Sequence, residues 1–294
     1  MTTARIEPHA IDTWTPSPGE AEREALCRAL EQGSVLHFPR LAFEVLPGER
    51  RFLTDAWATE SNKNISLRAG AAALRGAQGD LADLEVLRDM MARYAQSAGR
   101  LLDGLFPRYA ASRRTGATSF RPCSIEGRGL GWRRDDTRMH VDSFPSNPVQ
   151  GRRILRVFSN VHPEGVPRSW RVGETFPLFA GRFIARARAP LPGSSALLRT
   201  LGVTKSRRSR YDHLMLQLHA LAKGDEEFQR AAPRLHFDFP AGATWMAFSD
   251  QVVHAATAGQ FALEQTSYVD VDAMLDRAAS PLAALESLTG RSLA

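Results

Sequence analysis

The chain contains the run Arg234-Leu-His-Phe-Asp-Phe-Pro-Ala-Gly-Ala-Thr-Trp-Met-Ala-Phe-Ser249, in which two largely apolar segments flank a proline–glycine turn. Phe237 and Phe239 alternate with polar neighbours, as the buried face of a strand does. We therefore expect two strands joined by a tight turn at residues 240–243.

The same pattern of short strands and turn residues extends over most of the second half of the chain. We expect strands at residues 119–126, 153–161 and 261–271, with glycine-rich or proline-rich turns at 127–131 and 162–165. Many short strands of this kind predict a sandwich or a jelly roll, so the fold class is α+β with a mainly β core.

Helices are expected before, within and after this core. Residues 18–32 have an amphipathic pattern, and residues 81–105 carry apolar side chains at three- and four-residue steps. Residues 113–118 are expected to form a polar loop, residues 175–230 an arginine-rich helical insert, and residues 281–288 a short helix. With no linker in sight, we expect one domain over residues 1–294. Helices and edge strands would fill 1–115, the jelly-roll core 116–272, and a C-terminal helix 273–294.

Composition excludes several classes of protein. The 294 residues are 43% hydrophobic and 24% charged, which excludes wholesale disorder. No apolar run approaches the roughly 20 residues that cross a bilayer. Two cysteines are too few for a disulfide framework or a cysteine metal site. The first residues lack an apolar core and a cleavage signal, so the sequence predicts a cytoplasmic protein.

The positive charge is concentrated in one stretch. The chain has a net charge of +6, yet residues 152–210 hold thirteen basic and two acidic residues, so that stretch is +11 and the remainder −5. Such a block attracts anions, which could be nucleic acid, an anionic membrane or an acidic substrate. Only three of the 38 basic residues are lysines, a bias that favours bidentate anion binding but that codon usage would explain equally well.

The strongest chemical signal is His140-Val-Asp142, followed by a loop. Residues i and i+2 of a strand face the same way, so an imidazole and a carboxylate converge there. Two histidines and one carboxylate suit non-haem Fe(II), and His254 is the best third ligand. A second pair, His236 and Asp238, is the weaker alternative. We interpret the remaining histidines as core or surface residues, namely His9, His37, His162, His213 and His219.

Iron enzymes of this kind use 2-oxoglutarate, whose far carboxylate needs a buried cation, best an arginine. Arg156 lies in the middle of an apolar strand, where an unpaired guanidinium would be costly. It is the first candidate and Arg121 the second, although Arg156 could instead pair with a buried acid such as Glu264.

Four runs of sequence resemble those of the Kdo hydroxylases. They are Trp132-Arg-Arg-Asp-Asp-Thr-Arg-Met-His-Val-Asp-Ser-Phe-Pro-Ser146, Gly151-Arg-Arg-Ile-Leu-Arg-Val-Phe-Ser-Asn-Val161, residues 202–219 and residues 244–266. The resemblance is dense from residue 119 onward and looser before it. It implies a double-stranded β-helix with Fe(II), 2-oxoglutarate and O2, and iron ligands at His140, Asp142 and His254. Where many such dioxygenases carry a basic residue about ten positions after the distal histidine, this chain has Glu264.

The resemblance also implies a substrate and a place of action. The family hydroxylates the 3-position of the sugar acid Kdo in Kdo-lipid A, giving Ko, succinate and CO2. A phosphorylated, lipid-linked substrate suits the basic block and implies peripheral contact with the inner membrane of a Gram-negative bacterium. The residues expected to bind it are Arg133, Arg134, Arg152, Arg153, Lys205, Arg207, Arg208 and Arg210.

Two alternative functions remain open at this stage. One is a 2-oxoglutarate dioxygenase that acts on another anionic substrate. The other is a non-enzymatic jelly-roll binder of anionic glycans. Nucleic acid is disfavoured as a partner, because aromatic residues make up only 8% of the chain and do not interleave with the arginines as stacking platforms would.

Overall fold

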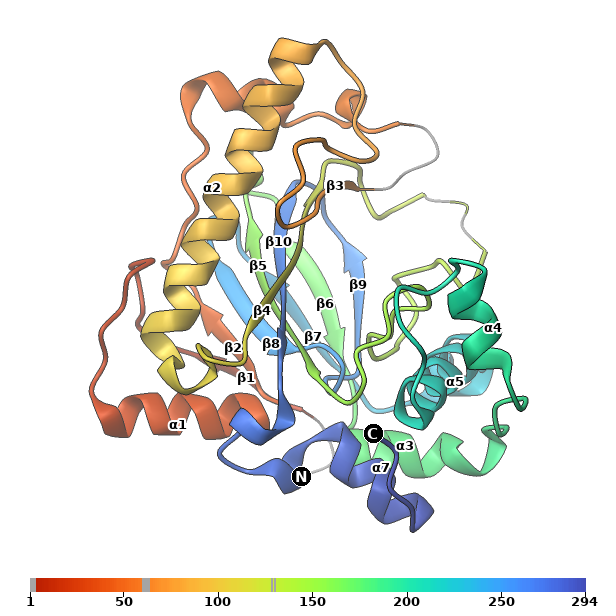
Figure 1. The fold of residues 1–294 in the computed structure, drawn as a ribbon. Coiled ribbons are helices and arrows are strands. Elements are labelled where there is room, and N and C mark those ends of the chain that lie inside the picture. The colour runs from red at the N-terminus through yellow and green to blue at the C-terminus, as the bar shows by residue number, and fades with distance from the viewer. Residues whose placement is uncertain (1–3, 60–63, 128, 130) are drawn as a thin grey trace.

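A computed structural model describes residues 4–59, 64–127, 129 and 131–294. Within them the strands form one large and one small sheet (Figure 1). All neighbouring strands are antiparallel except the parallel pair β1 and β2. The large sheet has the order β1 (Ile6–Pro8), β2 (Val35–Phe38), β8 (Thr244–Phe248), β5 (Arg153–Asn160), β10 (Ala262–Val269), β4 (Arg114–Arg121) and β3 (Ile65–Leu67). The small sheet has the order β7 (Leu235–Phe239), β6 (Arg168–Val172) and β9 (His254–Ala258).

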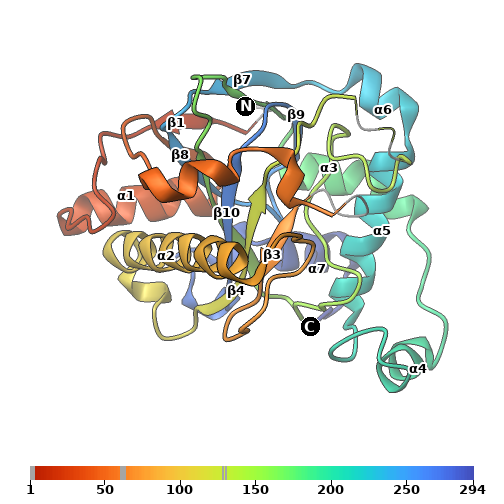
Figure 2. The same ribbon diagram turned by 90° about the horizontal axis from the view of Figure 1, so that it is seen from above.

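Two helices cover one face of the large sheet (Figure 2). They are α1 (Glu20–Glu31) and α2 (Leu81–Leu105), both close to the predicted ranges. Leucines of these helices pack against Leu155 and Val157 of β5 and against Met246 of β8. The side chain of Asp80 caps the first turn of α2 by accepting a hydrogen bond from the Asp83 amide.

The other face of the large sheet packs on the small sheet through aromatic rings. Phe158 of β5 and Trp245 of β8 contact Trp170 of β6, and Phe239 of β7 stacks on Trp245 with ring centroids 4.1 Å apart. Since neighbouring strand residues face opposite ways, residues that share the face of Phe158 lie between the sheets. Arg156 is one of them, and it is paired in register with Thr266 of β10.

The predicted C-terminal helix is confirmed, and several helices lie within residues 175–230. Residues 175–230 contain α3 (Phe176–Phe183), α4 (Ser194–Thr200), α5 (Arg210–Gly224) and most of α6 (Glu226–Ala231), and α7 (Pro281–Thr289) packs on α3. Short 3-10 helices are η1 (Pro47–Phe52), η2 (Asp55–Trp57), η3 (Pro107–Tyr109), η4 (Ile184–Arg186), η5 (Val271–Ala273) and η6 (Arg277–Ala279). Among the described residues, no helix has both the length and the hydropathy needed to cross a membrane.

The two strands of residues 234–249 and the turn between them are confirmed, but the two strands do not pair with each other. Gly242, with a φ of +82°, supports the turn between them. Beyond the turn, β8 pairs with β2 and β5 in the large sheet, whereas β7 pairs with β6 in the small one. The turn therefore connects two sheets instead of closing a hairpin.

The predicted polar loop at residues 113–118 is also wrong. Arg114 already belongs to β4, which ends at Arg121, earlier than the expected strand. The pairing of β4 with β10 explains this, because Thr115 and Arg114 are aligned with Ser267 and Tyr268 across a register shift. Residues 114–118 are polar, yet they form a strand because they pair with β10, which lies about 150 residues later in the chain.

Candidate metal centre and adjoining cavity

Backbone hydrogen bonds bring the three predicted metal ligands together between the sheets. His140 and His254 form an isolated antiparallel bridge, in which each backbone amide donates to the other's carbonyl at 2.9 and 2.8 Å. The Asp142 amide donates to the Ser249 carbonyl at 2.8 Å. One ligand atom from each of His140, Asp142 and His254 lies within 4.8 Å of the others, and all three residues are buried.

Both histidines are oriented with the same ring nitrogen toward this point. Nδ1 of His140 lies 2.7 Å from the Arg138 carbonyl, and Nδ1 of His254 lies 2.8 Å from the Val252 carbonyl. A carbonyl accepts, so each Nδ1 carries a proton and Nε2 is the ring nitrogen left to bind a metal. Burial, and next the neighbouring His140, lower the pKa of His254 to about 4, so its ring is neutral near pH 7. Neutral imidazoles with a fixed tautomer are what a metal site needs.

Two further rings hold the histidines in place. Trp170 stacks on His254 with centroids 4.9 Å apart, and His219 of α5 meets His140 edge-on at 5.0 Å. His219 hydrogen-bonds the Val141 carbonyl through Nδ1 at 2.7 Å. Burial, and next His140, lower the pKa of His219 to about 4. The sequence predicted His219 as a core or surface residue, and nothing in its spacing indicated a contact with the site.

A chain of alternating charges connects the site to the large sheet. Arg156 donates from Nη1 to Asp142 at 2.5 Å and from Nη2 to Glu264. Arg121 donates to the same Glu264 at 2.7 Å and lies 3.7 Å from Asp136. Burial is the largest single influence and would raise the pKa of Asp142, but Arg156, His140 and His254 together outweigh it and hold that pKa well below its ordinary value. Arg121 and Arg156 likewise lower the pKa of Glu264 against burial.

A cavity of about 620 Å³ opens beside this charge network. Arg156 and Glu264 line it on one side, and Tyr268 of β10 and Asn147, which hydrogen-bond each other at 2.8 Å, line another. The other charged residues that line it are all basic, namely Arg68, Arg114, Arg152 and Lys205. Arg152 and Lys205 are predicted substrate residues, whereas Arg68 and Arg114 escaped the sequence analysis because β3 and the start of β4 were not expected as strands.

One of the predicted substrate contacts is wrong. Arg153 is fully buried and donates to Asp250 at 2.9 Å and to Gln251 at 2.6 Å, with its guanidinium 3.8 Å above the Phe248 ring. The alternation of β5 explains this, because Arg153 shares the face of Leu155 and Val157, which α1 and α2 cover. The Arg153 guanidinium therefore pairs with a buried acid in the core and is not available to a substrate.

The other predicted basic residues lie on the surface or at its edge. Arg133 stacks on Trp132 at 4.1 Å and, with Arg208, lines a separate hollow of about 510 Å³. Arg208 also donates to the Pro145 carbonyl at 2.7 Å. Arg134, Arg207 and Arg210 are exposed, and Arg210 lines a hollow beside α4.

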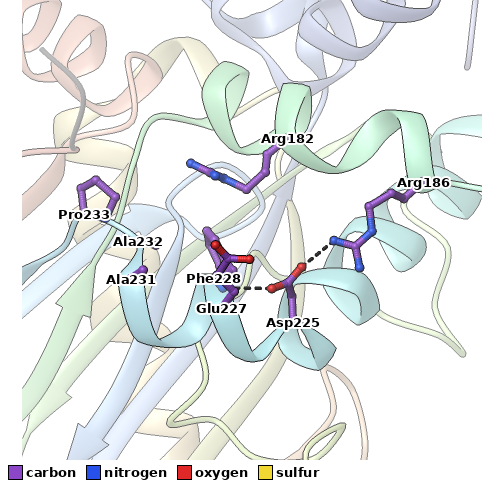
Figure 3. A pocket seen from close by; sticks show the side chains of 8 residues that line it. All are labelled: Arg182, Arg186, Asp225, Glu227, Phe228, Ala231, Ala232 and Pro233. Carbon is purple, nitrogen blue, oxygen red and sulfur yellow. Dashed lines mark hydrogen bonds and ion pairs between the residues drawn. The ribbon is translucent and has the colours of Figure 1, made fainter.

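Two arginines of the basic block pair with acids at the surface, with their side chains about half exposed. Figure 3 shows a hollow of about 290 Å³ between α3, η4 and α6, where Arg186 pairs with Asp225 at 2.5 Å. Arg182, at the same hollow, is bound by both carboxylate oxygens of Glu174. These two arginines are engaged with acids, so the hollow in Figure 3 offers mixed charge and lies apart from the three metal-ligand candidates.

The weaker His-x-Asp pair does not form a comparable site. His236 and Asp238 lie on β7 at the edge of the small sheet, contact each other at 3.1 Å, and are more than half exposed. Within the described ranges, the only group of three potential ligands close enough to share an ion is His140, Asp142 and His254.

Two imidazoles and one carboxylate, all buried and close enough to share one ion, are the donor set of mononuclear non-haem Fe(II) oxygenases. The sequence profile of the 3-deoxy-D-manno-oct-2-ulosonic acid (Kdo) hydroxylases matches residues 13–292, so the chain belongs to that family. A search of curated proteins finds no match.

Solved structures agree with the family. One is the Kdo hydroxylase KdoO, described as a non-heme Fe(II) alphaketoglutarate-dependent dioxygenase, in complex with alphaketoglutarate and Fe(III). It is 44% identical to this chain, with a TM-score of 0.94 over 98% of this chain and 97% of the other. Structures of the same enzyme with cobalt(II) and with succinate and Fe(III) match over the same shares at 44% identity, with TM-scores of 0.95 and 0.93.

Proposed function

We propose that this protein hydroxylates the 3-position of Kdo in a Kdo-bearing lipid A precursor, using Fe(II), 2-oxoglutarate and O2 and releasing Ko, succinate and CO2. The observation that carries the proposal is the convergence of His140, Asp142 and His254 beside a cavity rich in basic residues. Kdo carries a carboxylate and lipid A carries phosphates, so a cavity with this charge suits such a substrate.

The three proposed iron ligands fit the metal. Each histidine presents Nε2 because its Nδ1 is bound to a backbone carbonyl, and Asp142 stays ionised because Arg156 and the two histidines together offset its burial. Bound iron would supply the activation of O2 and the oxidation of the sugar C–H bond. The protein's contribution is to hold the ligands, to keep the sheet interface dry and to place the sugar over the open face of the site.

We propose Arg156 and Arg121 as the residues that bind the far carboxylate of 2-oxoglutarate. Arg156 is supported more strongly, since it lines the cavity and contacts Asp142 directly. Both guanidiniums are bound to Glu264 in this structure, so the co-substrate would have to share or displace that carboxylate. The expected alternative, in which Glu264 pairs with Arg156, is therefore present, and it is compatible with a role in anion binding.

We propose Arg152 and Lys205 as substrate contacts inside the cavity, and Arg133, Arg134, Arg207, Arg208 and Arg210 as contacts for more distant anionic groups. We also propose that residues 1–294 form one domain and that the two facing sheets are a double-stranded β-helix with the helical insert between β6 and β7. Aromatic packing across both sheets supports this arrangement.

The test uses purified protein, Fe(II), 2-oxoglutarate and Kdo-lipid A in air. We expect succinate formation coupled to the gain of one oxygen atom on the lipid, measured by mass spectrometry. Asp142→Ala and His254→Ala should reduce both to background. The matched control is His236→Ala with Asp238→Ala, which changes the exposed His-x-Asp pair and should retain full activity.

Three results would contradict parts of the proposal. Turnover by Asp142→Ala would contradict the assignment of Asp142 as an iron ligand. Succinate without oxygen on the lipid would indicate a dioxygenase with another substrate. Failure of the wild-type protein to bind iron at all would favour a non-enzymatic binder.

A further inference from the structure

The chain between α3 and α5 carries a cluster of exposed apolar side chains. Leu191, Leu197, Leu201 and Val203 are 77%, 59%, 65% and 51% exposed, and we call these four residues the apolar tip. They surround α4, which stands at the margin of the molecule, away from the sheets (Figures 1 and 2). The other exposed large apolar residues of the described chain are spread over several other elements, as is normal on a protein surface.

The charges around the apolar tip have one sign. No acidic residue occurs between Glu174 and Asp212, whereas eight basic residues do. Those that are exposed near the tip are Arg188, Arg199, Lys205, Arg207 and Arg210. Leucines surrounded by cations are the pattern of a surface that inserts apolar groups at a lipid headgroup boundary while its basic side chains meet anionic headgroups.

The apolar tip is joined to the mouth of the cavity. The Lys205 amide donates to the Ser146 carbonyl at 3.0 Å, and Arg208 donates to the Pro145 carbonyl at 2.7 Å. Lys205 and Ser146 both line the cavity beside the proposed iron site. A bilayer that contacts the tip would therefore lie next to the opening through which a lipid-linked sugar enters.

We propose that the apolar tip, together with Arg188 and Arg199, docks this protein onto an anionic lipid bilayer with the cavity mouth facing the membrane. This proposal rests on the proposed function, since a lipid-linked substrate would lie in the bilayer. The binding itself requires neither iron nor turnover, so it can be measured separately. A second copy of the chain fits the same surface poorly. A symmetric contact through this face would place arginines against arginines with no acid to neutralise them.

The test measures co-sedimentation with vesicles of phosphatidylcholine alone and of phosphatidylcholine mixed with phosphatidylglycerol. We expect binding to the mixed vesicles, weakening as salt is raised. The quadruple variant Leu191→Ser, Leu197→Ser, Leu201→Ser and Val203→Ser should lose at least about tenfold in affinity, since four apolar side chains no longer enter the interface. Arg188→Gln with Arg199→Gln should weaken binding to the mixed vesicles specifically.

The matched control replaces exposed apolar residues elsewhere: Leu46→Ser, Leu81→Ser and Leu235→Ser should bind as the wild type does. Wild-type protein that ignores the mixed vesicles, or a quadruple variant that binds them equally well, would overturn the proposal. So would light scattering that shows a wild-type dimer converted to a monomer by the quadruple variant while vesicle binding is unchanged. On a Kdo saccharide without acyl chains, the quadruple variant should turn over like the wild type, so loss of docking and loss of chemistry are separate results.

Discussion

Arg156 has two roles at the scale of single residues, and they can be separated. It contacts Asp142, a proposed ligand, and it lines the cavity in which 2-oxoglutarate would bind. A charge-assisted hydrogen bond contributes about 1.5–3 kcal/mol, so its loss should be visible in the affinity for the co-substrate.

We expect Arg156→Gln to raise the KM for 2-oxoglutarate roughly ten- to a hundredfold, and more than Arg121→Gln does. Arg156→Lys should restore part of the loss by keeping the charge. Arg114→Gln, at the same cavity but far along β4 from Arg121, is the control and should affect the lipid substrate instead. An equal rise in both KM values for Arg156→Gln would argue against a specific role with 2-oxoglutarate.

The buried histidines predict a pH dependence of stability. The pKa values of His219 and His254 are about 4 in the folded chain against an ordinary 6.5, so between these values the unfolded chain binds protons that the folded chain does not. The free energy of unfolding is therefore not reduced by these histidines above pH 6.5, and it decreases as the pH falls toward 4. Each histidine should cost roughly 2 kcal/mol at pH about 5.

Denaturant unfolding of iron-free protein at pH about 7.5 and about 5 measures this. The His219→Gln variant, which keeps a donor for the Val141 carbonyl, should lose roughly 2 kcal/mol less than the wild type between the two conditions. An identical loss in both proteins would show that His219 does not titrate in this way.

At the scale of elements, two adjacent arginines at the start of β5 have different surroundings and different roles. Arg153 faces the helices and neutralises Asp250, with neither side chain more than 1% exposed, whereas Arg152 pairs with Asp270 at the rim of the cavity. Removing one partner of a buried pair leaves an uncompensated charge.

We expect Arg153→Ala to lower the free energy of unfolding by about 3–5 kcal/mol. Arg152→Ala, the matched control one residue away, should change it by no more than about 1 kcal/mol because that pair is exposed to solvent. Per folded molecule, Arg152→Ala should lower activity on the lipid more than Arg153→Ala does, because Arg152 lines the cavity and Arg153 does not. A stable, fully folded Arg153→Ala would contradict the structural role of this pair.

Local patterns predicted the elements better than their partners. The helix Leu81–Leu105 and the strand Arg153–Asn160 follow from side-chain periodicity, which is a property of neighbouring residues. The pairing of β8 with β2, and the extended form of residues 114–118, depend on strands far away in the chain. No local pattern contains that information.

The candidate site shows the same division. His140 and His254 could be chosen by ligand chemistry, and sequence resemblance added weight to the choice. The Asp142–Arg156–Glu264–Arg121 network could be anticipated only as alternatives, because the strand register decides which acid meets which arginine. His219 enters from α5, and its contact with His140 depends on how the helical insert packs.

At the scale of the whole molecule, the charge has two fates. Arg153, Arg156, Arg182 and Arg186 are paired with acids, so that part of the +11 stretch is compensated within the chain, although only the first two arginines are shielded from solvent. The basic residues around α4 and at the cavity remain on the surface, and they are the part of the charge that can act on an anionic partner. Net charge alone did not distinguish these two populations.

The strand order also determines how much of the fold can form during translation. β2 also pairs with β8 and β4 with β10, so each of these early strands leaves a ribosome with one edge whose partner does not yet exist. His140 likewise waits for its bridge to His254. Nascent chains therefore carry unpaired strand edges for much of translation, and the three proposed iron ligands can meet only after His254 has emerged.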